Sequence, residues 1–294
     1  MKVLILGSQG QVGQSMLLAF QNTDIKIFHY SKEELSILDS ELLQNTISEI
    51  KPNYIINCAA YTKVDLAEQY PEKANQINFK AVKNICDASE DSSSALIHFS
   101  TDYVYDGKKS FPYNELDQER PLNHYGRSKL SGDQYILRNS DHFFIFRIAS
   151  VYSPFGNNFV KSILKLKDRD RLSIVDDQKF IPTSAKFLAE LIVDNIQKNN
   201  FTKDKSGLYN FSSAGSPVTW LGFARIVFTE CIKNNLILSS PSLDAISADE
   251  YNLPATRPEN SLLDNRKLIK NFEFNAEDFI LTLQKELPKI IKMI

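Results

Sequence analysis

Residues 4–16 read LILGSQGQVGQSM, an apolar run that leads into a turn with three glycines and then into an amphipathic segment. The glycines are spaced GxxGxxG, which differs from the GxGxxG of the standard dinucleotide fingerprint. Glycines permit a tight turn and close approach of the backbone to a pyrophosphate, and the following helix offers unpaired N–H groups at its N-terminus. A glycine turn that binds no ligand is the alternative. The order of strand, turn and helix favours a nucleotide site, formed by Gly7, Gln9, Gly10, Gln11, Val12 and Gly13.

Short apolar runs alternate with amphipathic segments through the first half of the chain. The predicted strands are residues 3–6, 25–29, 54–58, 95–100 and 143–147, and the predicted helices are residues 12–21, 40–50, 72–89 and 125–137. This alternation is typical of the α/β class, with a doubly wound, Rossmann-like parallel sheet covered by helices on both faces.

The second half of the chain is less regular and contains more turn residues. Two apolar runs, 172–175 and 208–211, are candidates for further strands of the same sheet, and residues 184–197 are predicted to form a helix. We predict a dinucleotide-binding domain at residues 1–150 and a smaller, mixed α/β substrate-binding lobe at residues 151–294. Segments at about 172–212 would return to the sheet, and residues 199–207 are expected to form an exposed loop.

The composition argues against a nucleic-acid-binding protein, a metalloprotein and a membrane protein. The 294 residues are 43% hydrophobic and carry a net charge of −2, which allows a sizeable core and provides no basic stripe for nucleic acid. The three cysteines and four histidines lack metal-ligand or disulfide spacing, so we expect no metal site and structural or surface roles for the histidines. Without a signal peptide or an apolar run of ~20 residues, a cytoplasmic protein with no membrane partner is expected. A homodimer is an option that the sequence leaves open.

The segment after the second predicted strand bears on the choice of cofactor. It reads FHYSKEELS, so Ser31 and Lys32 precede Glu33 and Glu34. An acidic residue here would pair with a ribose 2′-hydroxyl and favour NAD, whereas a hydroxyl and an ammonium suit a 2′-phosphate. The sequence therefore predicts NADPH or NADH as cofactor and favours NADP. The alternative is that Lys32 is only a solvated loop charge.

A second set of polar residues supplies the chemistry. Ser100, Thr101 and Asp102 follow the fourth predicted strand, and Tyr125 and Lys129 lie one helical turn apart in NHYGRSKLSG, residues 123–132. A free phenol has a pKa near ~10, and a neighbouring ammonium lowers it. We predict that Tyr125 protonates the alkoxide formed by hydride transfer, that Thr101 hydrogen-bonds the same oxygen, and that Lys129 also holds the nicotinamide ribose.

With these motifs, the chain resembles the extended short-chain dehydrogenases/reductases and, within them, the dTDP-4-dehydrorhamnose reductases. The resemblance runs nearly end to end through GSQGQVG, NCAAYTKVDLAE, STDYVYDG, PLNHYGRSKLSG, FGNNFVK, VDDQKFIPT and TRPENSLLD. It implies NAD(P)H-dependent reduction of the 4-keto group of dTDP-4-dehydro-L-rhamnose to dTDP-L-rhamnose for cell-surface polysaccharide. It also implies that Ala59, Ala60 and Tyr61 lie near the cofactor.

The substrate pocket is expected to contain downstream residues as well. Arg257 is the preferred cation for a diphosphate, while Lys161 is interpreted as part of a solvated helix face. The other candidates for substrate contact are Thr101, Asp102, Tyr103, Asn157 and Asn158.

Two positions depart from the pattern of the family that the chain resembles. Ser150 stands where relatives often have a tryptophan beside the sugar, and Ser36 stands where several carry an aspartate near the adenosine ribose. The departures concern the exact sugar and the cofactor preference, and they leave the hydride chemistry intact.

Alternatives remain at this point. One is a reductase or epimerase acting on another nucleotide-linked deoxysugar. Dehydratases on the same scaffold use an Asp–Glu pair, whereas here Asp102 is followed by Tyr103. Another is a non-catalytic, nucleotide-binding regulatory subunit, against which the intact Thr101, Tyr125 and Lys129 argue.

Overall fold

The computed structural model describes all residues, 1–294, and contains a central sheet of six parallel strands. The strand order is β10-β5-β4-β3-β1-β2. The strands are β1 (Lys2–Leu6), β2 (Lys26–Tyr30), β3 (Tyr54–Asn57), β4 (Ala95–Thr101), β5 (Phe143–Ile148) and β10 (Gly207–Asn210). The chain places β2 on one side of β1 and β3 on the other. The topological switch point, where such sheets bind ligands, therefore lies between β1 and β3.

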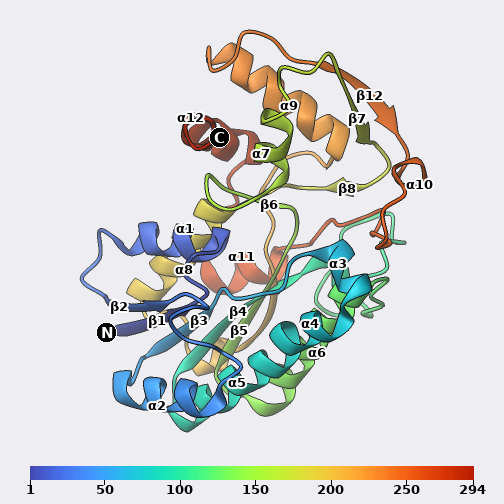
Figure 1. The fold of residues 1–294 in the computed structure, drawn as a ribbon. Coiled ribbons are helices and arrows are strands. Elements are labelled where there is room, and N and C mark those ends of the chain that lie inside the picture. The colour runs from blue at the N-terminus through green and yellow to red at the C-terminus, as the bar shows by residue number, and fades with distance from the viewer.

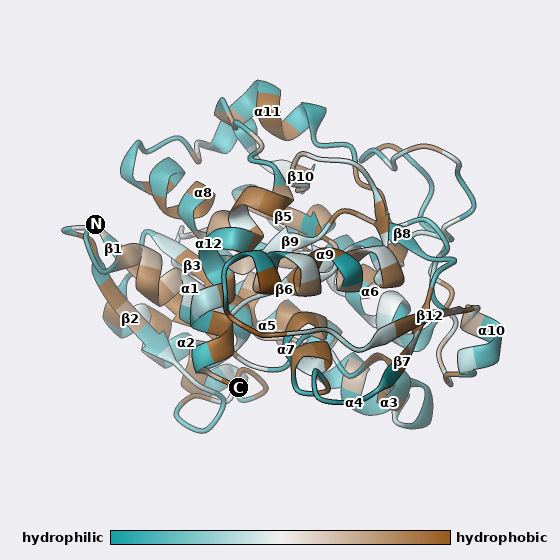
Figure 2. Ribbon diagram, turned by 90° about the horizontal axis from the view of Figure 1, so that it is seen from above, coloured by the Kyte–Doolittle hydropathy of each residue, from teal (hydrophilic) through white to brown (hydrophobic).

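Alternate residues of the strands enter two separate cores. Val3 and Ile5 of β1 pack beneath α1 (Gln11–Phe20), α8 (Ala185–Gln197) and α11 (Arg266–Phe272). Leu4 and Leu6 pack on the other face beneath α2 (Ser40–Ile50), α5 (Ala81–Asp91) and α6 (His124–Asn139). Both faces are thus covered, as the nearly continuous apolar runs predict. Figure 1 shows the two helix layers, and Figure 2 shows the hydrophobic colouring of the central strands.

A third core belongs to a smaller lobe, which occupies the upper part of Figure 1. Its helices are α7 (Phe159–Leu164), α9 (Trp220–Lys233), α10 (Ala248–Tyr251) and α12 (Phe279–Lys292). Its short strand pairs are β7 (Arg171–Val175) with β12 (Ser242–Ile246), β8 (Lys179–Phe180) with β11 (Val218–Thr219), and β6 (Val151–Tyr152) with β9 (Thr183–Ser184). None of the helices in the structure combines the length and apolarity needed to cross a membrane.

Two expectations about the second half need correction. Residues 172–175 do not join the central sheet, because β7 pairs with β12 and β10 takes the edge beside β5. The segment 199–207 is not simply an exposed loop. It includes the short helix η3 (Lys203–Lys205), and Phe201 is buried with its ring centroid 4.6 Å from that of Phe144. The buried Phe201 ring therefore anchors the otherwise polar segment 199–207 to the core.

The helix predicted at residues 72–89 is interrupted. The structure has α3 (Val64–Gln69), α4 (Pro71–Asn75), a π-helical turn η1 (Gln76–Lys80) and then α5. Within η1, Asn78 is fully buried; its Oδ1 accepts the Tyr61 N–H at 2.9 Å, and its Nδ2 donates to Ser128 Oγ at 2.9 Å. The π-helical turn therefore ties the loop after β3 to α6, in line with the frequent occurrence of such turns at functional sites.

Candidate active site

The glycine loop is shaped by two close backbone approaches. Gly7 has a φ of 76°, and a Cβ on it would lie 2.6 Å from Ala59 N. A Cβ on Gly13 would lie 2.4 Å from Gly7 O, so this position also admits only glycine without a shift of the loop. Helix α1 then begins after Gly10, with no side-chain cap and no acidic residue in its first turn. Its first N–H groups are therefore available to an anion. Gln9 and Gly10 are exposed, and Gln11 and Val12 are half-buried.

The segment after β2 holds an unsatisfied hydroxyl. Ser31 is buried, and its Oγ has no hydrogen-bond partner, while its N–H donates to Glu34 Oε2 at 2.7 Å. Lys32 is solvent-exposed, with its Nζ 3.4 Å from Glu33 Oε1. The Ser31 hydroxyl thus lacks a protein partner at the carboxyl end of β2.

The loop after β3 faces the glycine loop. Asn57 Oδ1 accepts the Ala59 N–H at 3.0 Å, and Asn78 holds Tyr61 from the other side. Ala60 is exposed between them. The loop expected beside the cofactor is therefore fixed by two buried asparagines, neither of which was predicted from the sequence.

The end of β4 and the start of α6 bring the predicted catalytic residues to one place. Thr101 Oγ1 donates to Asp102 Oδ1 at 3.0 Å and accepts the Tyr103 N–H at 3.2 Å at the start of the short helix η2 (Asp102–Val104). Burial raises the pKa of Asp102 to about 6. The Tyr103 and Tyr125 rings meet edge to face, with centroids 5.7 Å apart. Burial raises the pKa of the Tyr125 phenol. A hydrogen bond with the Thr101 hydroxyl lowers this pKa and so offsets part of the rise.

Local hydrogen bonds fix the start of α6. Asn123 is its N-cap, with Oδ1 accepting the Gly126 N–H at 2.8 Å and Nδ2 donating to Thr256 O at 2.8 Å. A Cβ on Gly126 would lie 2.2 Å from Tyr103 O, so the helix approaches η2 closely. Tyr125 is therefore held in the first turn of α6, at the carboxyl edge of the sheet.

Lys129 is anchored one turn further along α6. Its side chain is buried, and its Nζ donates to Phe99 O at 2.6 Å and lies 3.2 Å from His98 Nε2. Burial lowers the pKa of Lys129 to about 8. Burial also raises the pKa of Tyr125, so the expected lowering by Lys129 is not found in the free protein. The physical reason is that desolvation dominates for both groups.

A buried polar chain behind Lys129 was missed in the sequence. Asp133 Oδ2 accepts Ser100 Oγ at 2.6 Å and lies 3.4 Å from Arg147 Nε. Arg147 also donates to Tyr105 Oη and to Glu119 Oε1, both at 2.8 Å. His98 was interpreted as a lone structural or surface histidine, yet it lies fully buried beside Lys129. The available signals were an arginine ending the apolar run FFIFR and an aspartate four positions after Lys129.

The lobe contains a cavity of about 730 Å³. Its lining includes Phe159, Leu172, Trp220, Tyr251 and Arg257. The aromatic and aliphatic walls suit a flat apolar part of a ligand, and Arg257 is the only cation in a lining that also contains Asp177, Asp249 and Glu259.

The structure places four further residues that were considered for the substrate pocket. Asn158 caps α7 and donates to Gln11 Oε1 at 2.9 Å, so it joins the lobe to α1, whereas Asn157 is exposed. Lys161 is buried and donates to Pro154 O at 2.9 Å, so its assignment to a solvated face is wrong. Ser150 adopts a φ of 47°, and its carbonyl accepts the Thr183 N–H at 3.2 Å.

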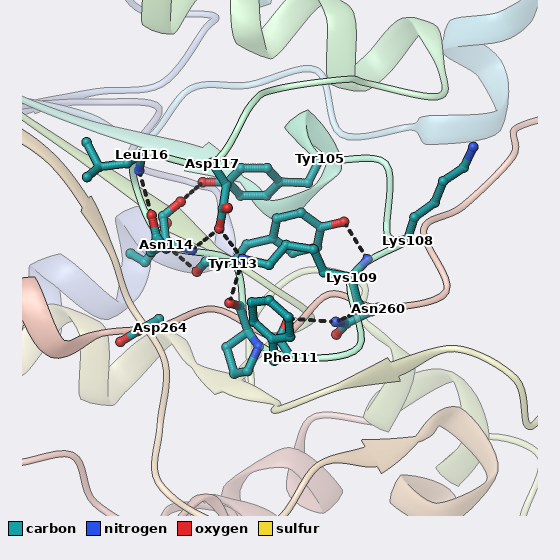
Figure 3. A network of polar contacts seen from close by, with 12 residues as sticks. Tyr105, Lys108, Lys109, Phe111, Tyr113, Asn114, Leu116, Asp117, Asn260 and Asp264 are labelled. Carbon is teal, nitrogen blue, oxygen red and sulfur yellow. Dashed lines mark hydrogen bonds and ion pairs between the residues drawn. The ribbon is translucent and has the colours of Figure 1, made fainter.

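A network of polar contacts holds residues 256–264 beside the segment after β4 (Figure 3). Asn260 Nδ2 donates to Lys109 O at 2.7 Å and to Phe111 O at 3.1 Å. The Tyr113 N–H donates to Leu262 O at 2.8 Å. These contacts hold the segment that follows Arg257 beside the residues after β4, whereas Arg257 itself donates to Asp65 and to Ala255 O.

Comparison with known proteins gives the same architecture and the same family. The family model described as the RmlD substrate binding domain matches residues 1–291. The dTDP-4-dehydrorhamnose reductase of Salmonella typhimurium is 35% identical over 294 residues, which cover 99% of this chain and 98% of that protein.

Two solved structures agree with the fold over nearly the whole chain. The dTDP-4-dehydrorhamnose reductase from Clostridium acetobutylicum has a TM-score of 0.90 at 29% identity, covering 98% of this chain and 99% of that one. The dTDP-4-dehydrorhamnose reductase from Bacillus anthracis, in complex with NADP, has a TM-score of 0.90 at 31% identity and the same coverage. The chain therefore belongs to the dTDP-4-dehydrorhamnose reductase family.

Proposed function

We propose that this protein reduces the 4-keto group of dTDP-4-dehydro-L-rhamnose to dTDP-L-rhamnose, with NADPH or NADH as the reductant. The observation that carries the proposal is the grouping of Thr101, Tyr125 and Lys129 at the carboxyl end of β4, two strands from β1 and its glycine loop. The similarity to dTDP-4-dehydrorhamnose reductases along the full chain supports the choice of substrate.

The residues around the glycine loop fit a dinucleotide. The uncapped first turn of α1 suits the diphosphate, and the unpartnered Ser31 hydroxyl suits a substituent of the adenosine ribose. The Bacillus anthracis relative was solved in complex with NADP. The residues proposed to hold the cofactor are Gly7, Gln9, Gly10, Gln11, Val12, Gly13, Ser31, Lys32, Ala59, Ala60, Tyr61, Ser100, Tyr125 and Lys129.

Reduction of a ketone requires one hydride and one proton. A reduced nicotinamide held by the residues named above would supply the hydride. Tyr125 donates its phenolic proton to the carbonyl oxygen, and Thr101 turns its hydroxyl from Asp102 to the same oxygen. Lys129 adds a positive charge to this buried region, where it stabilises negative charge on oxygen.

The lobe is proposed to bind the nucleotide sugar. Residues 1–150, with α8, β10 and α11, would hold the cofactor, and the rest of residues 151–294 would cover the substrate. Arg257 would meet the diphosphate at the edge of the 730 Å³ cavity. Asp102, Tyr103, Asn157 and Asn158 complete the proposed substrate contacts, with Asn158 acting through its position at the cap of α7.

The direct test supplies dTDP-4-dehydro-L-rhamnose with NADPH or NADH and follows the loss of absorbance of the reduced nicotinamide. We expect turnover that depends on both the sugar nucleotide and the cofactor, with dTDP-L-rhamnose as product. Absence of turnover with both cofactors, from protein that binds dTDP, would contradict the proposal. UDP-linked 4-keto sugars serve as the control for the nucleotide.

A further inference from the structure

A chain of hydrogen bonds leads from the loop after β3 to Lys129. The Ala59 N–H donates to Asn57 Oδ1 at 3.0 Å, Asn57 Nδ2 lies 3.0 Å from His98 Nδ1, and His98 Nε2 lies 3.2 Å from Lys129 Nζ. Asn57 and His98 are both fully buried, so no solvent competes for these contacts.

The chain fixes where the His98 ring carries its proton. A backbone N–H only donates, so the amide oxygen of Asn57 faces Ala59 and its NH₂ group faces the ring. An NH₂ group also only donates, so His98 Nδ1 accepts and the proton of the neutral ring lies on Nε2. Burial and the charge of Lys129 lower the pKa of His98 well below its ordinary value, in agreement with a ring that carries one proton.

The Nε2–H of His98 then faces two groups. One is Lys129 Nζ at 3.2 Å, which accepts a hydrogen bond as a neutral amine and not as an ammonium. The other is Asp133 Oδ1 at 3.9 Å, a buried carboxylate oxygen that has no hydrogen-bond partner. A shift of roughly 1 Å brings this second pair to hydrogen-bond distance.

We propose that His98 is a positioning residue for Lys129: its Nε2–H donates to the Lys129 amine when that amine is neutral, and to Asp133 Oδ1 when Lys129 is an ammonium. Each charge state of the lysine is thereby given a partner within the buried site. The relevance for catalysis rests on the proposed function, whereas the hydrogen-bond exchange is a property of the free protein.

The surrounding charges favour opposite states of Lys129. Asp133 on α6 favours the ammonium, and its own charge is shared with Arg147 on β5. The donated Nε2–H of His98 and the burial of the side chain favour the neutral amine. Tyr125, also on α6, is subject to the charges of Asp102 and Asp133.

The kinetic test is His98→Gln in the intact protein. Gln turns its carbonyl oxygen towards the ammonium, so the neutral amine loses its donor and the ammonium gains an acceptor. We expect the alkaline limb of the pH profile of kcat, near pH 8 in the wild type, to move up by about one unit, a tenfold change in the acid constant. The matched control is His142→Gln, whose ring contacts Phe201 O away from the site. An unchanged limb in His98→Gln would overturn the proposal.

A second readout needs neither substrate nor cofactor. In the free protein labelled with ¹⁵N-histidine, we expect His98 to show a protonated Nε2 and an unprotonated Nδ1, with an Nε2 shift that changes as Lys129 titrates. Lys129→Met should abolish that pH-dependent change. The opposite tautomer, or an Nε2 shift indifferent to Lys129, would overturn the proposal. If the wild type shows the expected shifts and no turnover, the proposed function fails while this inference stands.

Discussion

Two N–H groups of Arg257 bind the two carboxylate oxygens of Asp65, at 3.1 and 2.7 Å. The pair links α3, on the sheet side, to the segment that borders the lobe cavity. Both side chains are partly buried, at 17% exposure for Arg257 and 33% for Asp65. The cation proposed for the substrate diphosphate is therefore neutralised in the free protein, and an incoming phosphate competes with a carboxylate.

This relationship predicts the effect of Asp65→Asn on nucleotide binding. Removing the competing charge should tighten dTDP binding about tenfold at low salt, because ~1.4 kcal/mol is close to the net contribution of one charge-assisted hydrogen bond. Arg257→Gln should weaken the same binding. Isothermal titration calorimetry with dTDP measures both changes. Unaltered affinity in Arg257→Gln would show that this guanidinium does not meet the phosphates.

Gly13→Ala tests the proposed diphosphate site. The added Cβ would lie 2.4 Å from Gly7 O and 2.8 Å from Ser8 Cα, so the glycine loop must shift. We expect NADPH affinity to fall by at least about tenfold, measured by fluorescence titration. Gly222→Ala in α9 is the control, because its Cβ meets nothing closer than Thr219 Oγ1 at 3.3 Å. Equal NADPH affinity in both variants would place the diphosphate elsewhere.

Lys32→Ala tests the predicted preference for NADP. Lys32 is solvent-exposed beside Ser31, so its contribution to a 2′-phosphate should resemble that of an exposed ion pair, about 0.2–1 kcal/mol. We expect KM for NADPH to rise about 1.4- to fivefold and KM for NADH to stay constant. Lys108→Ala, an exposed lysine in the loop after η2, is the control. A parallel change for both cofactors would indicate that Lys32 is only a solvated charge.

Glu286 should make the protein less stable as the pH rises. Its side chain is buried, Ser184 donates to Oε1, Oε2 has no partner, and burial raises its pKa to about 7. A raised carboxyl pKa means that the native state binds the extra proton. Stability from this group is therefore present at low pH and is lost between about pH 4.5 and 7.

The matching prediction is that Glu286→Gln removes this loss. At pH 8 the variant should be more stable than the wild type by about 2–3 kcal/mol, with a smaller difference at pH 5. Urea unfolding at both values measures the difference. Asp194→Asn, an exposed carboxyl on α8 paired with Lys198, should change little. If the stability of the wild type and that of Glu286→Gln depended on pH in the same way, Glu286 would not be the source of the pH dependence.

The sheet was predictable because its strands are apolar on both faces. The predicted boundaries of β1 to β5 fall within one residue of the structure, and α2 has the predicted range Ser40–Ile50. The run at 172–175 was not placed correctly, because a short alternating run does not reveal which strand it will pair with. The π-helical turn at Gln76–Lys80 was missed, since its amphipathic pattern resembles that of a continuous helix.

Motifs in the sequence indicate only part of the proposed site. Thr101, Tyr125 and Lys129 were identified from their spacing and from the strand that precedes them. His98, Asp133 and Arg147 were missed, because a buried polar chain depends on contacts between β4, α6 and β5 that spacing does not show. The Asp65–Arg257 pair was missed for the same reason, since its partners are 192 positions apart.

The most direct test of the central claim compares Tyr125→Phe with the wild type in the reduction of dTDP-4-dehydro-L-rhamnose. Tyr135→Phe, on the same helix with its hydroxyl bonded to Asp87, provides the matched control. Our prediction is a loss of kcat of at least ~100-fold in Tyr125→Phe, the scale of a general acid's contribution, with dTDP affinity retained and Tyr135→Phe near wild type. A Tyr125→Phe variant with wild-type kcat would contradict it.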